Sequence, residues 1–388
     1  MKLTKDKKKC VLAIALLFSI LTNIGAGKIY PQKVKKVVNY NLSVILPLTG
    51  NLSFLGIPIK NAFLLAEEDW KNKLRNSGVY ININFGDSQG NPKTAVSVYM
   101  QNQAIKPANA VFSFLSGQTG ALKPIVEQSN ALFIAATIDP SICKGSKHLI
   151  RPYYSLGAEA KSLLSFIKYL KPKSVGIIYS IDAATAYAAE QITIPGLKSY
   201  GIPTTVQTFK VRERNFRNKV QVIKKMSPDI VITNGFGSDL PFLVNTLREQ
   251  SVFPPATVIG PIGVADAIPG QGTEPFKGMF YFGPDFLRPD FEKNNPEFKD
   301  FKNRYIKQFG PKQFGESAVY AYDTYQIIAE TLLSVKTTDT MKIFKYITQN
   351  NLFGIAGIYN FDESGNCEPS IVLARVNEDG TISSIKIQ

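Results

Sequence analysis

The chain has 388 residues, of which 44% are hydrophobic and 19% are charged, and its formal net charge is +15. This length and composition exclude disorder on a large scale and allow two ordinary domains, each with its own core. The lysines are scattered and form no basic stripe interleaved with aromatic residues, so we interpret the charge as a solvated basic surface and expect no nucleic-acid partner.

The first residues have the charged, apolar and small-residue order of a secretory signal peptide. Five lysines precede residue 10, an apolar segment covers 11–21, and small residues follow at 25–27. The apolar run is short for a membrane span, although an uncleaved anchor running on to Gly27 is an alternative. We therefore expect a signal peptide at residues 1–26 and a periplasmic location. Export would leave Cys143 and Cys367 in an oxidising compartment, either as a pair or as two separate, partly buried thiols.

The rest of the chain alternates between strand-like and helix-like segments. We expect strands at 41–46, 79–85, 111–115 and 132–136, and helices at 56–74, 93–105 and 121–130. A second series has helices at 158–170, 183–200, 216–226 and 240–250, and strands at 174–179, 204–209, 230–233 and 256–259. Helices then dominate 294–335 and 341–350, and the chain is strand-like from 357 onward. Such alternation predicts an α/β fold of two similar lobes with doubly wound parallel sheets, which can close on a ligand by hinge motion.

The candidate site lies where two neighbouring apolar strands of the first series end. The residues at these two ends are Ser116, Gly117, Gln118, Thr119, Ala135, Ala136 and Thr137. Parallel strands bring their carboxyl ends to one edge of a sheet, and open α/β folds bind ligands at that edge. Helix N-termini there offer free backbone N–H groups, which suit a carboxylate or another anion.

Aromatic residues at comparable edges of the second series, Tyr187 and Phe236, could close over an apolar part of the ligand. Each of these assignments has a structural alternative. Ser and Thr residues after strands often serve as caps or turn residues, Tyr187 can pack within its helix, and Phe236 can belong to the core.

The residues that most enzymes need are missing or badly placed. His148 is the one histidine of the chain, and no HExxH motif or cysteine–histidine cluster is present. No nucleophile elbow lies near His148, to which we assign a surface or capping role. Residues 117–123 lack the spacing of a P-loop, and 235–237 carry only two glycines of a dinucleotide motif. We expect a binding protein that is not an enzyme and has no cofactor or metal.

A set of loose motifs, taken together in order and spacing, resembles a known family. The motifs are Leu46-Pro47-Leu48-Thr49-Gly50 with Gly56 and the helix to Asp69, Gly86–Pro92 with Ala95-Val96, Ala135-Ala136-Thr137, Gly278-Met279, Gly354-Ile355-Ala356-Gly357 and Phe361-Asp362-Glu363-Ser364-Gly365. The chain resembles, from about Leu42 to its end, the periplasmic substrate-binding proteins of ABC importers typified by the leucine/isoleucine/valine-binding protein.

The resemblance implies the type I periplasmic binding fold, in which two Rossmann-like lobes are joined by three crossovers. We place these crossovers near Arg151, Tyr281 and Phe353. The first lobe would then contain residues 37–150 and 282–352, and the second lobe would contain residues 151–281 and 353–388.

The resemblance also implies how a ligand would be held. Family members bind the carboxylate of an amino acid with backbone and hydroxyl groups of the first lobe, at positions that correspond to Ser116-Gly117 and Ala135–Thr137. Phe54 or Leu55 stands where a first-lobe aromatic residue would lie.

The chain departs from the family where the ammonium group of the ligand would bind. Family members use an acidic residue after a Gly-Pro pair, but here Gly260-Pro261 is followed by Ile262, and Tyr187 precedes Ala188 instead of glycine. An apolar Ile262 cannot compensate for the desolvation of an ammonium group. The candidates to replace the missing acid are Asp239, Asp266 and Glu316.

Together these features predict an exported receptor that captures a small ligand between two lobes and delivers it to an ABC permease in the inner membrane. A ligand with a carboxylate or amide and an apolar body fits best, such as an amino acid or an aliphatic or aromatic acid. We expect the receptor to be a monomer. The alternative is a ligand- or protein-binding regulatory or sensor protein on the same fold, without a role in transport.

Overall fold

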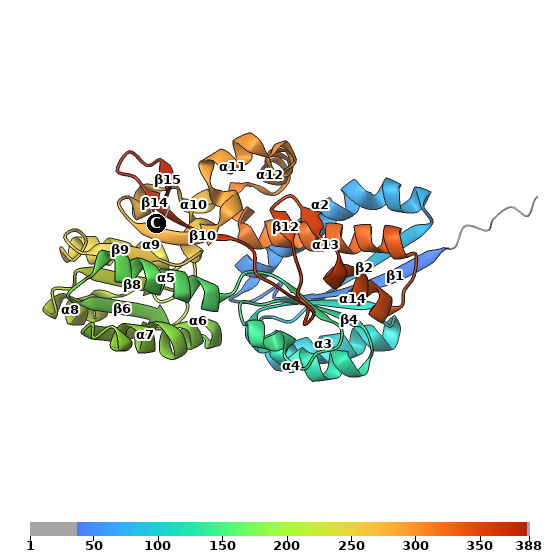
Figure 1. Cartoon of the computed structure of the whole chain (residues 1–388), viewed down its shortest axis with the longest axis horizontal. Helices are drawn as coiled ribbons and strands as arrows, with labels where there is room; N and C mark the ends of the chain where they lie inside the picture. The colour runs from blue at the N-terminus through green and yellow to red at the C-terminus, as the bar shows by residue number, and fades with distance from the viewer. Residues whose placement is uncertain (1–36, 386–388) are drawn as a thin grey trace, which may run out of the picture. The chain divides into compact units, whose positions relative to one another are not determined.

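The structure of the chain is a computed structural model that describes residues 37–385. The signal peptide expected at residues 1–26 lies outside the described residues. Two large sheets organise the described part, and helices cover both faces of each sheet (Figure 1). The fold is therefore the two-lobed α/β fold that the sequence predicts.

The first sheet has six strands in the order β13-β5-β4-β3-β1-β2, and all neighbouring strands are parallel. These strands are β1 (Val38–Leu46), β2 (Val79–Asp87), β3 (Ala110–Phe114), β4 (Leu132–Ala136), β5 (Leu149–Pro152) and β13 (Asn366–Cys367). Helices α2 (Ser53–Asn76), α13 (Glu316–Val335) and α14 (Thr340–Gln349) pack on one face, and α3 (Pro92–Ile105) and α4 (Ser116–Gln128) pack on the other. Every residue of β3 and β4 is buried, as parallel strands between two helix layers should be.

The second sheet has seven strands in the order β15-β14-β10-β9-β8-β6-β7. Its parallel part consists of β6 (Val175–Ser180), β7 (Thr204–Phe209), β8 (Ile230–Asn234), β9 (Thr257–Gly260) and β10 (Phe280–Pro284). Strands β14 (Ile371–Val376) and β15 (Ile382–Ile385) extend it in antiparallel fashion.

The helices of the second lobe form one layer on each face of this sheet. Helix α5 (Leu156–Leu170) lies on one face with the continuous segment α6 (Ala183–Tyr187), η2 (Ala188–Thr193) and α7 (Ile194–Ser199). Helices α8 (Arg217–Lys225), α9 (Leu240–Glu249) and α10 (Gly263–Gln271) lie on the other. The segment 183–200 is expected from its sequence to be mostly helix with an interruption at Pro195-Gly196. In the structure Pro195 and Gly196 lie inside α7, and the departure from α-helix is the π-helical middle turn η2.

The chain passes between the lobes three times. It leaves the first sheet after Pro152 and the second sheet after Pro284, where η4 (Asp285–Leu287), α11 (Pro289–Asn294), α12 (Pro296–Phe309) and η5 (Pro311–Gln313) lead to α13. The third passage follows Cys367, not Phe353 as expected. The hairpin of β11 (Leu352–Gly354) and β12 (Gly357–Tyr359) packs into the core of the first lobe, and β13 pairs with β5. Residues 353–367 thus belong to the first lobe.

Two further features bear on the location and redox chemistry expected from the sequence. No helix within residues 37–385 is both long and apolar enough to cross a membrane. Cys143 lies in the short helix η1 (Pro140–Cys143) and Cys367 in β13, and both thiols are buried and free. Of the two alternatives for these cysteines, the structure shows two separate thiols.

Candidate ligand-binding site

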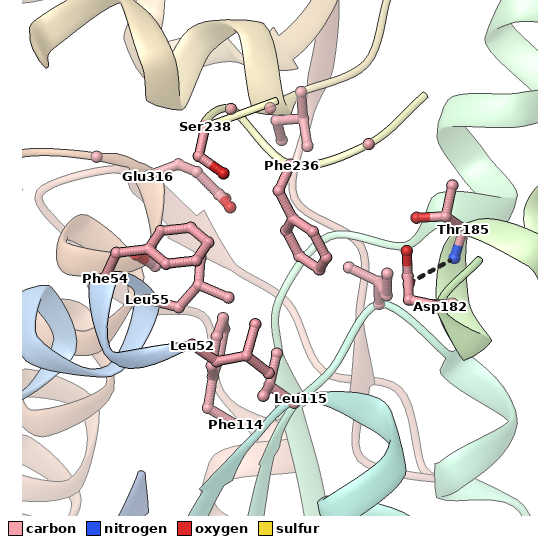
Figure 2. Close-up of a pocket in the computed structure, with 18 of the residues that line it drawn as sticks. Leu52, Phe54, Leu55, Phe114, Leu115, Asp182, Thr185, Phe236, Ser238 and Glu316 are labelled. Atoms are coloured by element: carbon pink, nitrogen blue, oxygen red, sulfur yellow. Dashed lines mark hydrogen bonds between the residues drawn. The ribbon is translucent and has the colours of Figure 1, made fainter. Parts of the chain in front are cut away.

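A cavity of about 530 Å³ lies between the two lobes (Figure 2). Its walls come from the loops after β3 and β4 of the first sheet, the loops after β6, β8 and β9 of the second sheet, and the first turns of α2 and α13. Both sheets therefore present their carboxyl ends to the same space, as open α/β folds do at their binding sites. A mostly apolar cavity of this size with a few polar groups is typical of small-molecule sites.

Two hydroxyl groups meet on the first-lobe wall of the cavity. Ser116 is the first residue of α4 and Thr137 follows β4, and their side-chain oxygens are 2.6 Å apart. Leu115 has a φ of +77°, a value that leucine rarely adopts, and it turns the chain from β3 into α4 at the cavity. The first N–H groups of α4 therefore lie next to the two hydroxyls, and such a group of donors can bind a carboxylate.

The residues expected around these hydroxyls divide into two groups. Gly117 and Ala136 line the cavity, whereas Thr119 and Ala135 are buried inside the lobe, where the Thr119 hydroxyl lies 3.0 Å from that of Ser113. Neighbouring strand residues point to opposite faces, which explains why Ala136 reaches the cavity and Ala135 does not.

Gln118 also lines the cavity, but its side-chain amide is engaged within the lobe. Its nitrogen donates to the carbonyl oxygens of Ile45 and Phe114. The amide oxygen is buried and accepts no hydrogen bond from the described residues. Gln118 can therefore offer a ligand an acceptor.

Two aromatic rings, one from each lobe, lie at the cavity. Phe54 at the start of α2 and Phe236 after β8 meet edge to face, with ring centroids 6.3 Å apart (Figure 2). Tyr187 does not line the cavity and is 48% exposed. Thr185 of the same helix faces the cavity instead, because residues two apart in an α-helix are separated by about 200° and point to opposite sides.

The acidic candidates occupy different places. Ile262 lines the cavity as an apolar side chain, whereas Asp239 is buried outside the lining and pairs with Arg214 at 3.0 Å. The side chain of Asp266 lies outside the described part of the chain. Glu316 lines the cavity, and its Oε1 atom accepts a hydrogen bond of 2.7 Å from the Tyr153 hydroxyl.

Residues 40–381 match the family model described as "Periplasmic binding protein". The chain belongs to this family of binding proteins.

Individual relatives agree with this assignment. "Leu/Ile/Val-binding protein homolog 2" of Brucella abortus (strain 2308) is 22% identical over 350 residues, which are 86% of this chain and 90% of the relative. Two solved structures share the fold. The branched-chain amino acid transporter substrate binding protein LivJ of Streptococcus pneumoniae, in complex with isoleucine, has a TM-score of 0.74 and 16% identity, covering 91% of this chain and 100% of the other. A solute binding protein of an ABC transporter from Rhodopseudomonas palustris BisB5, in complex with 3,4-dihydroxy benzoic acid, has a TM-score of 0.78 and 19% identity, covering 90% and 96%.

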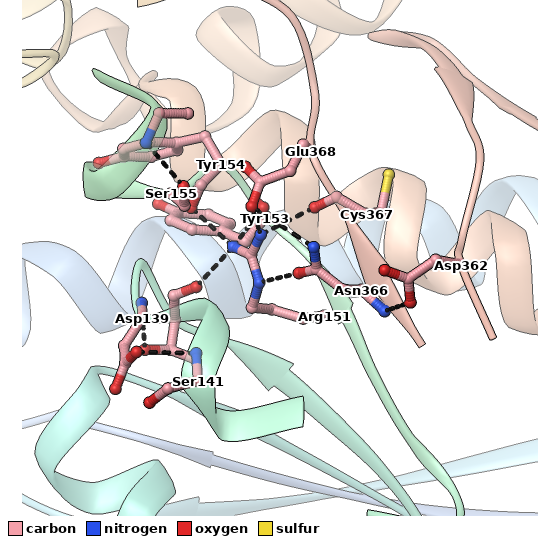
Figure 3. A network of polar contacts seen from close by, with 12 residues as sticks. Asp139, Ser141, Arg151, Tyr153, Tyr154, Ser155, Asp362, Asn366, Cys367 and Glu368 are labelled. Carbon is pink, nitrogen blue, oxygen red and sulfur yellow. Dashed lines mark hydrogen bonds and ion pairs between the residues drawn. The ribbon is translucent and has the colours of Figure 1, made fainter. Parts of the chain in front are cut away.

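In this periplasmic binding protein the first and third passages between the lobes meet at one buried arginine (Figure 3). Arg151 of β5 is fully buried. Its guanidinium donates to the carbonyl oxygens of Thr137, Tyr153, Tyr154 and Cys367 and to the side chains of Asn366 and Glu368, at 2.6–3.1 Å. Arg151 thus joins the strand end that carries Thr137 to both connections, a role that no motif in the sequence indicated.

The single histidine has no place in the site. His148 is buried next to β5, where its carbonyl oxygen accepts the N–H of Phe133, and it does not line the cavity. The surface role assigned from the sequence is therefore wrong, because the side chain is buried and its Nδ1 atom has no hydrogen-bond partner among the described residues. Within residues 37–385, no three His, Cys, Asp or Glu side chains are grouped so that they could hold a metal ion.

Proposed function

We propose that this periplasmic binding protein is an exported solute receptor that captures an amino acid or a related carboxylate or amide compound for an ABC importer. The observation that carries the proposal is the cavity between the two lobes, with the hydroxyls of Ser116 and Thr137 2.6 Å apart at the N-terminus of α4. These donors would hold the carboxylate, and Phe54, Phe236 and the apolar walls would hold the body of the ligand.

The comparisons support this ligand class. Isoleucine and 3,4-dihydroxy benzoic acid, the ligands bound in two structures of the same fold, both carry a carboxylate on an apolar or aromatic body. The receptor would act in the periplasm as a monomer that delivers its ligand to a membrane permease, without catalysing a reaction. No nucleic acid takes part in this proposal.

Native mass spectrometry of the protein from its own exported fraction tests the proposal first. We expect a small bound molecule that is lost on partial unfolding. We also expect the double variant Ser116→Ala, Thr137→Val to bind this molecule about 100- to 10,000-fold more weakly, because it removes two hydrogen bonds to a charged group and each contributes about 1.5–3 kcal/mol. Ser165→Ala, which changes an exposed serine of α5, is the matched control.

Calorimetric titration gives the affinities, and thermal melting shows that each variant is folded. If no molecule is bound, and no amino acid or organic acid shifts the melting temperature, solute transport is contradicted. The regulatory or sensor function on the same fold would then replace it.

A further inference from the structure

A carboxyl group forms part of the buried cavity wall. Glu316 is the first residue of α13, it is 3% exposed, and its side chain points toward the space between Phe54 and Phe236 (Figure 2). The Tyr153 hydroxyl, which comes from the first passage between the lobes, donates to Oε1 of this carboxyl group at 2.7 Å. The sequence could not place Glu316, because α13 returns to the first lobe only after the five parallel strands of the second sheet, β6 to β10.

The other charged side chains of the lining are used differently. Asp182 accepts hydrogen bonds from the Thr185 N–H at 3.0 Å and from the Ser180 hydroxyl at 2.6 Å, and it thereby caps α6. Lys312 is exposed. Glu316 is therefore the charged residue of the lining that combines deep burial with a side chain directed into the cavity.

Glu316 is connected to the strand ends that carry the hydroxyl pair through Tyr153. The Tyr153 ring lies 5.9 Å from the ring of Phe114, the last residue of β3. The carbonyl oxygens of Tyr153 and Thr137 both accept from the same nitrogen of Arg151, at 2.6 and 3.1 Å. The acceptor Glu316 and the donors at Ser116 and Thr137 thus belong to the same lobe and to one connected set of contacts.

A positively charged group in the cavity would stabilise the Glu316 carboxylate. A buried carboxylate loses its hydration, and it is stabilised best by an opposite charge together with hydrogen bonds. A carboxylate can accept about four hydrogen bonds, and the Tyr153 hydroxyl is one of the partners that this group has in the protein. A ligand amino group in the cavity would add both a positive charge and further donors.

We propose that Glu316, oriented by Tyr153, receives the positively charged amino group of the ligand. The first lobe then holds both polar ends of an amino acid, and the second lobe covers the ligand with the uncharged side chains of Thr185, Phe236 and Ile262. This inference rests on the proposed function. It makes Glu316 a specificity-determining residue on α13, whereas the loop after β9 lines the cavity with the apolar residues Pro261 and Ile262.

Matched ligand pairs test the inference. Two pairs differ only in the amino group: L-isoleucine with 3-methylpentanoic acid, and L-phenylalanine with 3-phenylpropanoic acid. Benzoate and 4-hydroxybenzoate are added as aromatic acids that lack an amino group. Calorimetric titration should show that the better amino acid binds at least about 10- to 100-fold more tightly than its deamino partner. Glu316→Gln should remove most of this ratio while the affinity for the deamino acid changes little, and Tyr153→Phe should reduce the ratio in part.

The control variant is Glu330→Gln, which removes an acid from the same helix outside the cavity lining. Glu316 also lies in the first turn of α13, where a negative charge stabilises a helix, so Glu316→Gln can lower the stability of the fold. Thermal melting of all variants separates such a loss of stability from a loss of selectivity. The inference is overturned, and the proposed function kept, if a deamino acid or a benzoate binds as tightly as any amino acid and Glu316→Gln leaves that binding unchanged. If neither an amino acid nor an organic acid binds, the proposed function fails and the inference falls with it.

Discussion

Buried charged side chains are placed in this molecule at the points where its parts join. Arg151 donates through all three guanidinium nitrogens and links the strand end at Thr137 to the residues that follow β5 and β13. Asp239 holds the loop after β7 by accepting from the Arg212 N–H at 3.1 Å and from Arg214 at 3.0 Å. Such groups are costly to bury unless they are fully paired, so their partners define one arrangement of the chain.

Glu159 is a buried acid that makes the stability depend on pH. It lies on α5 and accepts the backbone N–H of Ile262, while its second oxygen has no partner among the described residues. Burial raises the pKa of Glu159 to about 8, although the hydrogen bond from Ile262 lowers it. The folded protein therefore keeps this proton between pH 4.5 and 8, where the unfolded chain has lost it. The contribution of Glu159 to the free energy of unfolding is therefore fully present below pH 4.5, and it is lost as the pH rises toward 8.

Glu159→Gln should flatten this dependence. A single such group contributes a slope of up to about 1.4 kcal/mol per pH unit to the free energy of unfolding. Urea unfolding at pH 5, 6, 7 and 8 measures the slope. The variant should gain stability relative to the natural protein as the pH rises, because glutamine does not ionise and still accepts the Ile262 N–H. Glu363→Gln, at an exposed position, should keep the natural slope. Equal slopes for all three proteins would show that Glu159 does not titrate in this range.

At the scale of elements, the apolar patterns predict most of the strands and helices because each parallel strand is a continuous apolar run between two helices. They also predict which strand ends meet, so Ser116 and Thr137 are found together. The apolar pattern does not predict features that depend on contacts between segments far apart in the sequence. The phase of α6, which turns Thr185 inward and Tyr187 outward, depends on packing, and β13 has only two residues and carries no pattern of its own.

The pairing of β13 with β5 depends on a glycine. Gly365 has a φ of +81°, and a Cβ atom there would lie 1.9 Å from the carbonyl oxygen of Leu149. Its own carbonyl oxygen accepts the N–H of Arg151 at 2.8 Å, so the glycine holds the third passage against the first. A side chain at this position would separate the two segments and weaken the Arg151 contacts with Asn366 and Cys367.

Gly365→Ala should therefore lower the free energy of unfolding by about 3 kcal/mol or more, since it adds a backbone clash to the strain of a positive φ. Gly310→Ala is the matched control, because Gly310 has a φ of +86° with no atom near its Cβ position, and it should cost only about 1 kcal/mol. Denaturant unfolding of both variants gives the comparison. Equal losses would mean that the strain alone matters and that the contact with Leu149 relaxes freely.

At the scale of the whole molecule, the loop after β7 is one of the places where the two lobes touch. Arg212 follows β7 in the second lobe, and its guanidinium donates to the Asn51 side chain of the first lobe at 3.0 Å. The same guanidinium lies over the Phe54 ring, 5.6 Å from its centroid. Because Asp239 fixes the backbone of Arg212, the side chain reaches across from a rigid support. These contacts can form only while the lobes are together, so they should act on the release of a ligand and not on its capture.

Arg212→Ala should accordingly increase the dissociation rate of the ligand about 5- to 30-fold, as expected for the loss of one exposed hydrogen bond and one cation–π contact of about 0.5–1 kcal/mol each, with little change in the association rate. Stopped-flow mixing, followed by displacement with excess ligand, gives both rates. Lys224→Ala removes the same charge from an exposed site on α8 and should change neither rate. If the association rate falls and the dissociation rate does not change, Arg212 attracts the ligand through its charge, because electrostatic steering acts before the lobes come together.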